Sequence, residues 1–339
     1  MTAAGTRPAA PDAPVNEEQL TIREAVISGI AAEMRSDPSI ILIGQDIGEF
    51  GGPLQCTAGL LAEFGLDRMV QTPICESSMM SMAVGAAASG LRPVVDLMFS
   101  DMLPLVAVPL IQTAASLRYF TDGALTAPLV VRTRGGDGPY RSHPQNYEAL
   151  FAHSPGLTIV QPSNPRDAKG LIQSAIRSDD PVIFIENIFL YNAFRDPVPV
   201  GDVSVEIGRA DIVRPGDTVT VVGYGRSVRS AVQAAEVLAQ DGVAVEVIDL
   251  RTLYPWDEAL VMDSVQRTGR LVVAHEAWET GGLGAEIVAR VTSECFEALA
   301  RPPVRVGAPA IPIPWASGLR DATLPTVGRV VDAIRQVLR

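Results

Sequence analysis

Short apolar runs alternate with segments of helical periodicity along most of this chain. The segment TIREAVISGIAAEMRSD has apolar residues at helical spacing, and SIILIGQDI after it has the length and composition of a buried strand. The alternation continues through LRPVVDLMF, PLVVRTRGG and GLTIVQPSNPRDAKGLIQSAIRSDDPVIFIE. Strands that are apolar on both faces are typical of a parallel sheet covered by helices. The pattern therefore predicts a doubly wound α/β domain over residues 19–195.

The alternation stops at a stretch rich in Pro, Gly and Asp and then resumes. This stretch, YNAFRDPVPVGDVSVEIGRADIVRPGD, predicts a linker at residues 196–212. After it, the strand-like runs TVTVVGYG, VAVEVIDL and RLVVAHEA alternate with helical segments, and LPTVGRVVDAIRQVLR predicts a last helix. A second doubly wound α/β domain is therefore predicted over residues 213–339. Residues 1–18, rich in Ala and Pro, predict a flexible N-terminal arm.

Composition and charge exclude several classes of protein. The 339 residues are 47% hydrophobic and 19% charged, which is too apolar for a disordered chain. The net charge of -12, without a run rich in Lys and Arg, predicts no nucleic-acid partner. The most apolar stretches, such as residues 103–111, are short and interrupted by Pro, so no association with a membrane is predicted.

The cysteine and lysine content narrows the chemistry further. Cys56, Cys75 and Cys295 form no C-x-x-C pair, which disfavours a disulfide framework or a zinc site and favours a reducing compartment. The first residues lack the long apolar core of a signal peptide, so we expect a cytoplasmic protein. Lys169, the only lysine, lies at the start of an ordinary amphipathic helix, so no P-loop exists and a Schiff-base enzyme is disfavoured.

One acidic residue interrupts a stretch of small and apolar side chains. In QTPICESSMMSMAVGAAASG, Glu76 precedes a run of Met, Ala, Gly and Ser. Such residues pack closely, so we expect the Glu76 carboxylate to be desolvated, and a buried carboxylate without a partner is costly. Glu76 therefore either meets a specific partner or caps a helix that begins near Ser77.

Seven motifs follow one another between Thr72 and Val306, within a similarity that runs from about Thr21 to the C-terminus: TPICE, GAAASGLRPVVDLMFSD, FAHSPGLTIVQPSNPRDAKGLIQSAI, DPVIFIEN, EVIDLRTLYPWD, SVQRTGRLVVAHEAWETGGLGAEI and LARPPVRV. Together they resemble the β subunits of the thiamine-diphosphate-dependent 2-oxo acid dehydrogenases, within the transketolase superfamily. The resemblance implies a transketolase-like pyrimidine-binding domain followed by a transketolase C-terminal domain. It also implies an enzyme, active only with its α partner, that decarboxylates a 2-oxo acid and transfers the acyl group to a lipoyl carrier.

The resemblance assigns roles to three residues. It implies that Glu76 hydrogen-bonds the N1′ nitrogen of the aminopyrimidine of the cofactor, where an apolar pocket helps a carboxyl group to share a proton. It implies that His143 binds the substrate carboxylate or moves a proton, although Pro144 stands where the family has Ser. Met102, where relatives carry Phe or Tyr, would pack on the aminopyrimidine. A surface-loop histidine and a plain core methionine are the alternative interpretations.

The same resemblance implies binding sites for two cations, potassium and Mg²⁺. The stretch SAIRSDDP implies a potassium site built from oxygen atoms, and an ordinary helix-to-strand turn is the alternative. The candidate potassium ligands are Leu129, Ala175, Ile176, Ser178 and Asp180. In the family, Mg²⁺ and the diphosphate are held by a GDG…NN motif of the α subunit. A GDG occurs here at residues 136–138, but no Asn-Asn follows it, so we interpret this match as a coincidence.

The partners follow from that missing motif. The resemblance predicts an α2β2 heterotetramer in which thiamine diphosphate is shared with an α subunit carrying GDG…NN, and Mg²⁺ is held by that α subunit. A lipoyl acyltransferase is a further predicted partner, and the substrate is a small 2-oxo acid. The alternatives are half of a carboligase that passes the acyl group to an aldehyde or ketone, and a degenerate structural or regulatory β-like subunit.

The segment SDMLPLVAVPLIQTAASLRYF departs from the family pattern. Val108 and Pro109 stand where relatives carry an Asp-Gln pair. A proline inside a helix removes a backbone hydrogen bond and clashes with the preceding turn. We therefore predict that the helix kinks near Pro109 or begins there. Together with Met102 and Pro144, this change supports the hypothesis of a specialised substrate or acyl acceptor.

Overall fold

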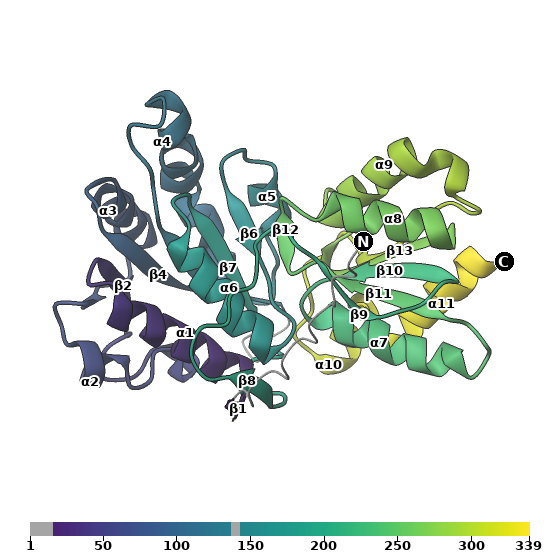
Figure 1. Ribbon diagram of the computed structural model, residues 1–339, viewed down its shortest axis with the longest axis horizontal. Helices are drawn as coiled ribbons and strands as arrows, with labels where there is room; N and C mark the ends of the chain where they lie inside the picture. The colour runs from purple at the N-terminus through teal and green to yellow at the C-terminus, as the bar shows by residue number, and fades with distance from the viewer. Residues whose placement is uncertain (1–15, 137–142) are drawn as a thin grey trace, which may run out of the picture.

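Two α/β domains lie next to each other in the computed structural model, which describes residues 16–136 and 143–339 (Figure 1). The predicted fold class is therefore confirmed. The sheet of the first domain has seven strands in the order β12–β6–β7–β5–β4–β2–β3, and only β12 runs antiparallel to its neighbour. Its strands are β2 (Ile40–Gly44), β3 (Met69–Gln71), β4 (Arg92–Phe99), β5 (Val130–Gly135), β6 (Thr158–Val160), β7 (Val182–Asn187) and β12 (Thr252–Tyr254).

Helices cover both faces of this sheet because its strands present apolar side chains to both faces. In β4, Val94 packs against α1 and α6, whereas its neighbour Val95 packs against α3 and the segment after β4. The helices on the first face are α1 (Ile22–Ser36) and α6 (Pro165–Arg177). Those on the second face are α3 (Glu76–Ala88), η2 (Ser100–Val106), η3 (Val108–Ala114) and α4 (Ala115–Phe120), and the short elements are η1 (Pro53–Gln55), α2 (Leu60–Phe64) and α5 (Glu148–Ala152).

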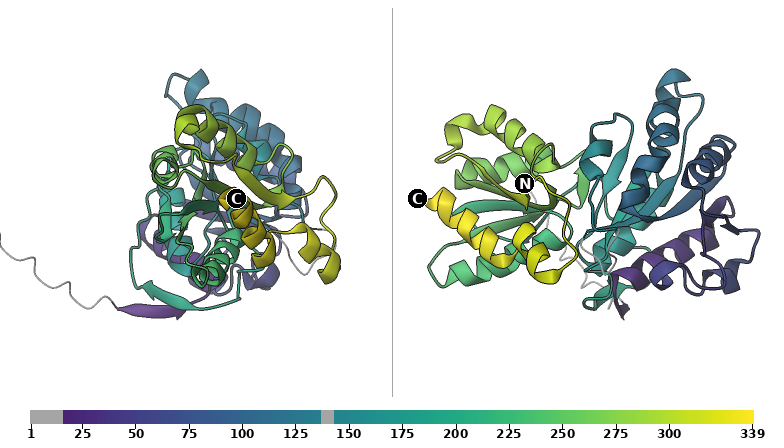
Figure 2. Two further views of the ribbon diagram at one scale, coloured as in Figure 1. Left: turned by 90° about the vertical axis from the view of Figure 1, so that its right-hand side faces the viewer. Right: turned by 180° about the vertical axis from the view of Figure 1, so that it is seen from behind.

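The second domain repeats this layered arrangement around five strands in the order β14–β13–β10–β11–β9. The strands are β9 (Asp211–Arg214), β10 (Val219–Gly223), β11 (Val245–Asp249), β13 (Leu271–Trp278) and β14 (Val304–Ala308). One face is covered by α7 (Arg226–Ala239) and α11 (Val327–Leu338), and the other by α8 (Glu258–Thr268) and α9 (Leu283–Cys295) (Figure 2). The elements η4 (Phe296–Ala298) and α10 (Ser317–Thr323) complete the domain.

The two domains share strands and core. β12 follows β11 in the sequence but pairs with β6 at the edge of the first sheet. One hydrophobic cluster continues from α3 and η2, through Leu253 of β12, to α8 and α9. Residues 196–212, the predicted linker, contain β8 (Asp196–Pro199) and the start of β9, and β8 pairs with β1 (Glu17–Leu20). The exact domain boundaries stay a prediction.

The predicted irregularity at Pro109 is confirmed. η2 and η3 are a 3-10 helix and a π-helix, and Pro109 lies in the first turn of η3. The segment Ser100–Val106 is bent by 55° from Val108–Phe120. Among the described residues no single helix is long and apolar enough to span a membrane, although this bent pair would pass by length and composition.

Four fully buried charged residues connect the central strands of the first sheet. Arg134 of β5 donates to Asp96 of β4, with Nη1 2.9 Å from Oδ1, and Arg132 donates to Glu186 of β7, with Nη2 2.9 Å from Oε2. Burial raises the pKa of the Asp96 carboxyl, but Arg134 and then Arg132 more than offset that effect, so the pKa is lowered. The four formal charges cancel, as buried ion pairs require.

The Asp96–Arg134 pair also shapes the end of β4. Met98 has a φ of 66°, and the pairing of β4 with β5 shifts register between Asp96 and Phe99. Asp96 Oδ1 accepts from the Met98 N–H at 3.1 Å, and Arg134 Nη1 donates to the Met98 carbonyl at 3.0 Å. A left-handed backbone is costly for a methionine. The buried pair therefore stabilises the bulge from which Phe99 and the next residues leave the sheet.

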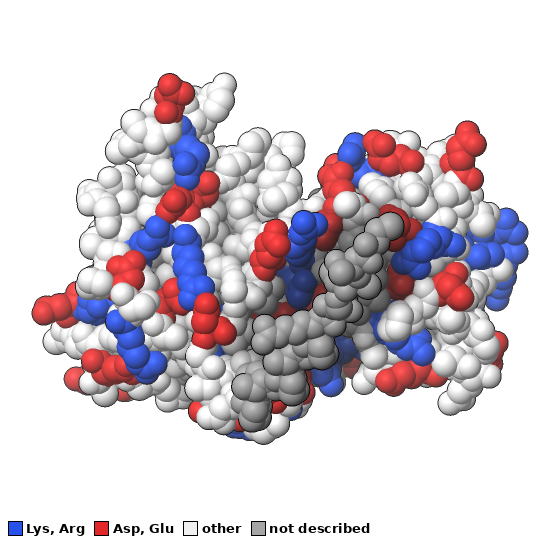
Figure 3. Space-filling view, viewed as in Figure 1, with Lys and Arg blue, Asp and Glu red and all other residues white. Residues whose placement is uncertain are grey.

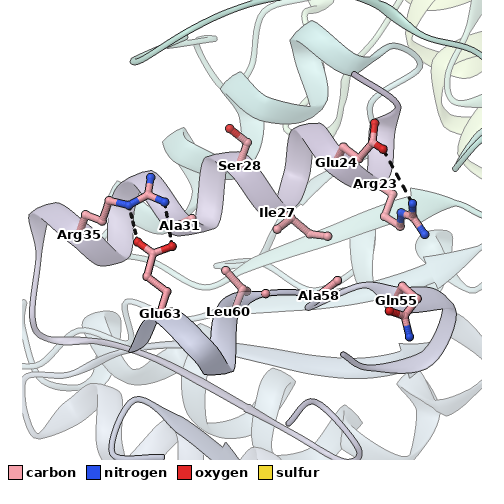
Figure 4. A pocket seen from close by; sticks show the side chains of 11 residues that line it. Arg23, Glu24, Ile27, Ser28, Ala31, Arg35, Gln55, Ala58, Leu60 and Glu63 are labelled. Carbon is pink, nitrogen blue, oxygen red and sulfur yellow. Dashed lines mark hydrogen bonds and ion pairs between the residues drawn. The ribbon is translucent and has the colours of Figure 1, made fainter. Parts of the chain in front are cut away.

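Asp96→Asn should destabilise the first domain by about 3–5 kcal/mol, because it leaves the Arg134 guanidinium buried without a counter-charge. The matched control is Glu63→Gln, which breaks the exposed Arg35–Glu63 pair across the groove between α1 and α2 and should cost less than about 1 kcal/mol (Figure 4). Urea denaturation followed by circular dichroism measures both. Similar midpoints for the two variants would contradict this view of the buried network.

Candidate active site

The sheet brings the three candidate site residues to one edge. β3, β4 and β5 end shortly before Glu76, Met102 and His143, respectively. These strands are parallel members of one sheet, with β4 and β5 adjacent. Ligands of such folds bind outside the carboxyl ends of the strands. The carboxyl edge of the first sheet is therefore the candidate active site.

Glu76 is the first residue of α3. Cys75 is the N-cap, no side chain caps the helix, and the interpretation of Glu76 as a cap is therefore wrong. Within the described chain the Glu76 carboxylate has no hydrogen-bond or ion-pair partner, and it is half-buried rather than buried as expected. The reason is that the first turn of α3 lies at the surface of the single chain.

The surface next to Glu76 is apolar. Ile74 and Val108 are 76% and 64% exposed, and Leu105 and Met82 are about half exposed. Ser77 Oγ donates to the Leu105 carbonyl at 2.6 Å, so η2 is tied to the first turn of α3. The surface over α3 is largely free of charged side chains, whereas charges of both signs cover the region of α1 and α2 (Figure 3). Exposed apolar surface around a carboxylate indicates a site that another molecule covers.

Met102 lies in η2 and not on the strand that precedes it. Its side chain is partly buried against the core formed beneath α3 and η3. Met102 can therefore be a core residue and still contact a ligand, because part of its side chain stays exposed. Its role toward an aminopyrimidine stays a prediction.

His143 is held against the end of β4. Its imidazole stacks on Phe99, with ring centroids 4.5 Å apart and ring planes at 7°. Burial lowers the pKa of His143, and its Nδ1 atom has no hydrogen-bond partner among the described residues. The ring is therefore neutral near pH 7 and free to accept or donate a proton. The GDG match at residues 136–138 lies mostly outside the described residues.

The candidate potassium ligands lie in the last turn of α6, on the turn between α6 and β7, and just before β5. Their oxygen atoms already accept hydrogen bonds from the protein: Arg92 Nη1 donates to the carbonyls of Ile176 (3.1 Å) and Ser178 (2.9 Å), and Arg118 Nε donates to Asp180 Oδ1 (2.7 Å). A carbonyl oxygen has a second lone pair, so this set is still suited to a hard cation. In residues 16–136 and 143–339, no cluster of His, Cys, Asp and Glu could hold a metal ion.

A buried polar chain between the domains was not predicted. Tyr224 donates to Glu148 Oε1 at 2.9 Å and stacks on His275 of β13, with ring centroids 6.0 Å apart. The His275 Nδ1 atom lies 3.1 Å from the Ala277 carbonyl. Burial raises the pKa of Glu148 and lowers that of His275 to about 4. The charged residues of HEAWE directly after an apolar strand run were the signal in the sequence.

A second carboxyl group, Asp101, was also missed. It is the second residue of η2 and lies beside the candidate site. Burial raises its pKa to about 6, and the backbone N–H of Gln145 opposes that effect. Its signal was the polar pair Ser-Asp that directly follows the apolar β4 run.

Comparisons with known proteins place both domains. Residues 18–192 match the family "Transketolase, pyrimidine binding domain" and residues 208–330 match "Transketolase, C-terminal domain". The chain is 36% identical over 317 residues to the 2-oxoisovalerate dehydrogenase subunit beta of Bacillus subtilis, covering 93% of this chain and 97% of that protein. It is 38% identical over 334 residues to the pyruvate dehydrogenase E1 component subunit beta of Rhizobium meliloti, covering 97% of this chain and 73% of that protein.

A solved structure shares the fold. It is described as a split-gene transketolase, inactive beta4 tetramer, and it aligns with a TM-score of 0.76 at 22% identity, covering 95% of this chain and 99% of that chain. At this identity the likeness supports the two-domain fold alone.

His275 should stay neutral down to about pH 4. Its folded pKa lies below the ordinary value of 6.5, so the unfolded chain binds the proton first as the pH falls. Stability that is present above pH 6.5 is therefore lost between pH 6.5 and 4, by up to about 3 kcal/mol for this group. Side-chain NMR of the three histidines measures the titration. A midpoint near 6.5 for His275 would contradict its burial.

Proposed function

Because this chain belongs to the family of the β subunits of 2-oxo acid dehydrogenases, we propose that it forms half of an enzyme that acylates a lipoyl carrier. Its family is that of 2-oxo acid dehydrogenase (decarboxylating) β subunits, which work with an α subunit in a heteromeric complex and use thiamine diphosphate. The names of the relatives, pyruvate and 2-oxoisovalerate dehydrogenase, support a short 2-oxo acid as the substrate.

The observation that carries this proposal is the Glu76 carboxylate, which has no partner in the described chain and lies beside an apolar surface. A carboxylate in such a place is suited to hydrogen-bond one ring nitrogen of a flat heterocycle whose other contacts are apolar. Met82, Leu105 and Val108 supply apolar area for a partner chain next to the same position. We infer that the α subunit covers this surface and completes the pocket around the Glu76 carboxylate.

The residues of this chain act by orientation and proton transfer. Bound thiamine diphosphate supplies an electron sink for the carbon that loses CO₂. Glu76 would hold the aminopyrimidine at its N1′ nitrogen and would share a proton with that atom. The neutral imidazole of His143, held by Phe99, binds the substrate carboxylate or moves a proton in a later step. Met102 would pack on the pyrimidine ring.

The cations complete the proposal. Mg²⁺ and the diphosphate are assigned to a GDG…NN motif of the α subunit, in an α2β2 heterotetramer, because no Asn-Asn follows the GDG of this sequence. Potassium is assigned to the turn between α6 and β7, where carbonyl oxygen atoms gather. A lipoyl acyltransferase is the proposed acceptor protein. The substitutions at Met102, Pro109 and Pro144 favour a specialised substrate or acceptor, whereas the named relatives favour the dehydrogenase over a carboligase or a degenerate subunit.

The chain alone should bind thiamine diphosphate weakly and decarboxylate no 2-oxo acid, because half of the pocket is missing. Adding an α subunit with GDG…NN should give a heterotetramer that releases CO₂ and acylates a lipoyl domain. Calorimetric titration with cofactor and Mg²⁺, followed by an assay with a panel of 2-oxo acids, lipoyl domains and aldehydes, tests this. Tight binding and turnover by the chain alone would refute the proposal, and ligation to aldehydes without acylation would establish the carboligase.

Glu76→Gln should leave the complex assembled and slow hydrogen–deuterium exchange at the thiazolium carbon by about 100-fold or more, because an amide cannot share a proton with N1′. Glu63→Gln, the same change in the exposed pair on α2, serves as the matched control and should exchange like the wild type. His143→Ala should keep the exchange and slow a later step. Wild-type exchange in Glu76→Gln would rule out the assigned role.

A further inference from the structure

Three consecutive residues at the end of β4 hold the segment that carries His143. Phe99 stacks on the His143 ring, and Ser100 Oγ donates to the Gln145 carbonyl at 2.6 Å. The Asp101 carboxyl group faces the Gln145 backbone N–H, which lowers the pKa of that carboxyl group against the larger effect of burial. Two neighbouring residues of η2 thus face the backbone of Gln145: Ser100 binds its carbonyl oxygen, and Asp101 lies at its N–H.

We propose that Ser100 and Asp101 are positioning residues, which clamp Gln145 and thereby fix the imidazole of His143 for its step. The inference rests on the proposed function, because it assumes that His143 acts on the substrate. It goes further by naming the residues that determine where this imidazole lies.

Pro144 makes the clamp effective. The ring of this buried proline fixes its φ, and a residue before proline is restricted to extended backbone. Few soft torsions therefore separate the Gln145 peptide from the His143 ring. With Pro144 between them, a restraint on Gln145 is passed to His143 better than it would be with a flexible residue at position 144. The departure from the family at Pro144 therefore has a physical use.

The far side of the segment is held as well. Asn146 Oδ1 accepts from the Gly136 N–H at 2.8 Å, at the end of β5. The His143 ring, in contrast, has no hydrogen bond at Nδ1 among the described residues, so its direction depends on the stack and on its backbone. The stack on Phe99 of β4 and the clamp from η2 are therefore the restraints that hold the ring on this side.

The acceptor function of Asp101 does not need its charge. Ser100 is 1% exposed and Asp101 is half-buried, with its Oδ2 atom buried and without a partner. Either the ionised or the protonated carboxyl group keeps an oxygen for the Gln145 N–H, and so does an asparagine amide. A catalytic role of the carboxyl group would require the charge or the proton, and this difference separates positioning from catalysis.

The kinetic test compares Asp101→Ala, Asp101→Asn, His143→Ala and the double variant Asp101→Ala/His143→Ala in the reconstituted complex. Asp101→Ala should slow acyl transfer by about 10- to 100-fold through misplacement of the imidazole. Thiazolium exchange should stay at the wild-type rate, and Asp101→Asn should recover most of the activity. The double variant should be no slower than His143→Ala, since both act through one residue. Multiplied losses, or an Asp101→Asn as slow as Asp101→Ala, would overturn the proposal.

A spectroscopic test measures the position of the His143 ring without an activity assay. In the chain alone, the Phe99 ring should shift the imidazole proton signals of His143 upfield, and Phe99→Leu and His143→Ala assign those signals. Asp101→Ala and Ser100→Ala should lose this shift, Asp101→Asn should keep it, and circular dichroism shows whether each variant is folded. If the wild-type complex has no activity, the proposed function fails, and this measurement still decides the positioning. An unchanged shift in folded Asp101→Ala and Ser100→Ala would overturn it.

Discussion

The buried pairing of Asp96 with Arg134 is the interaction on which the site depends. The pair lies near the carboxyl ends of β4 and β5. It supports Met98, which has a left-handed backbone, by hydrogen bonds to both the N–H and the carbonyl of that residue. That bulge sets the direction in which Phe99 leaves β4, and Phe99 carries the His143 ring. A fully buried ion pair thus connects the core of the sheet to His143, the residue that is proposed to act on the substrate.

The elements were largely predictable from local pattern, and the non-local contacts were not. Apolar runs predicted β2, β4, β5 and β7 because doubly covered strands need no polar face. The run TLY of β12 gave no sign that it crosses to the first sheet and pairs with β6, because strand pairing depends on residues almost a hundred positions apart. The sequence shows the two arginines of PLVVRTRGG but does not show that they are buried. Their burial depends on carboxylates that β4 and β7 bring to them.

The candidate site shows the same division. Glu76 was singled out by the run of small and apolar residues that follows it, and its role came from the resemblance. The expectation that it is desolvated fails in the single chain because the first turn of α3 is open to solvent. In the proposed function another chain covers this carboxylate, and no pattern within one sequence shows such a cover. Ser100 and Asp101 were overlooked because their function lies in contacts with Gln145, not in a residue type with chemistry of its own.

The central claim is that Glu76 holds the pyrimidine nitrogen of a cofactor shared between two chains. The most direct test is ¹⁵N NMR of thiamine diphosphate labelled at N1′, bound to the complex with the α subunit. The account predicts that the N1′ signal of the wild-type complex moves far from its free position, as protonation by Glu76 requires, and that in Glu76→Gln it stays near the free position. The same N1′ shift in both complexes would contradict it.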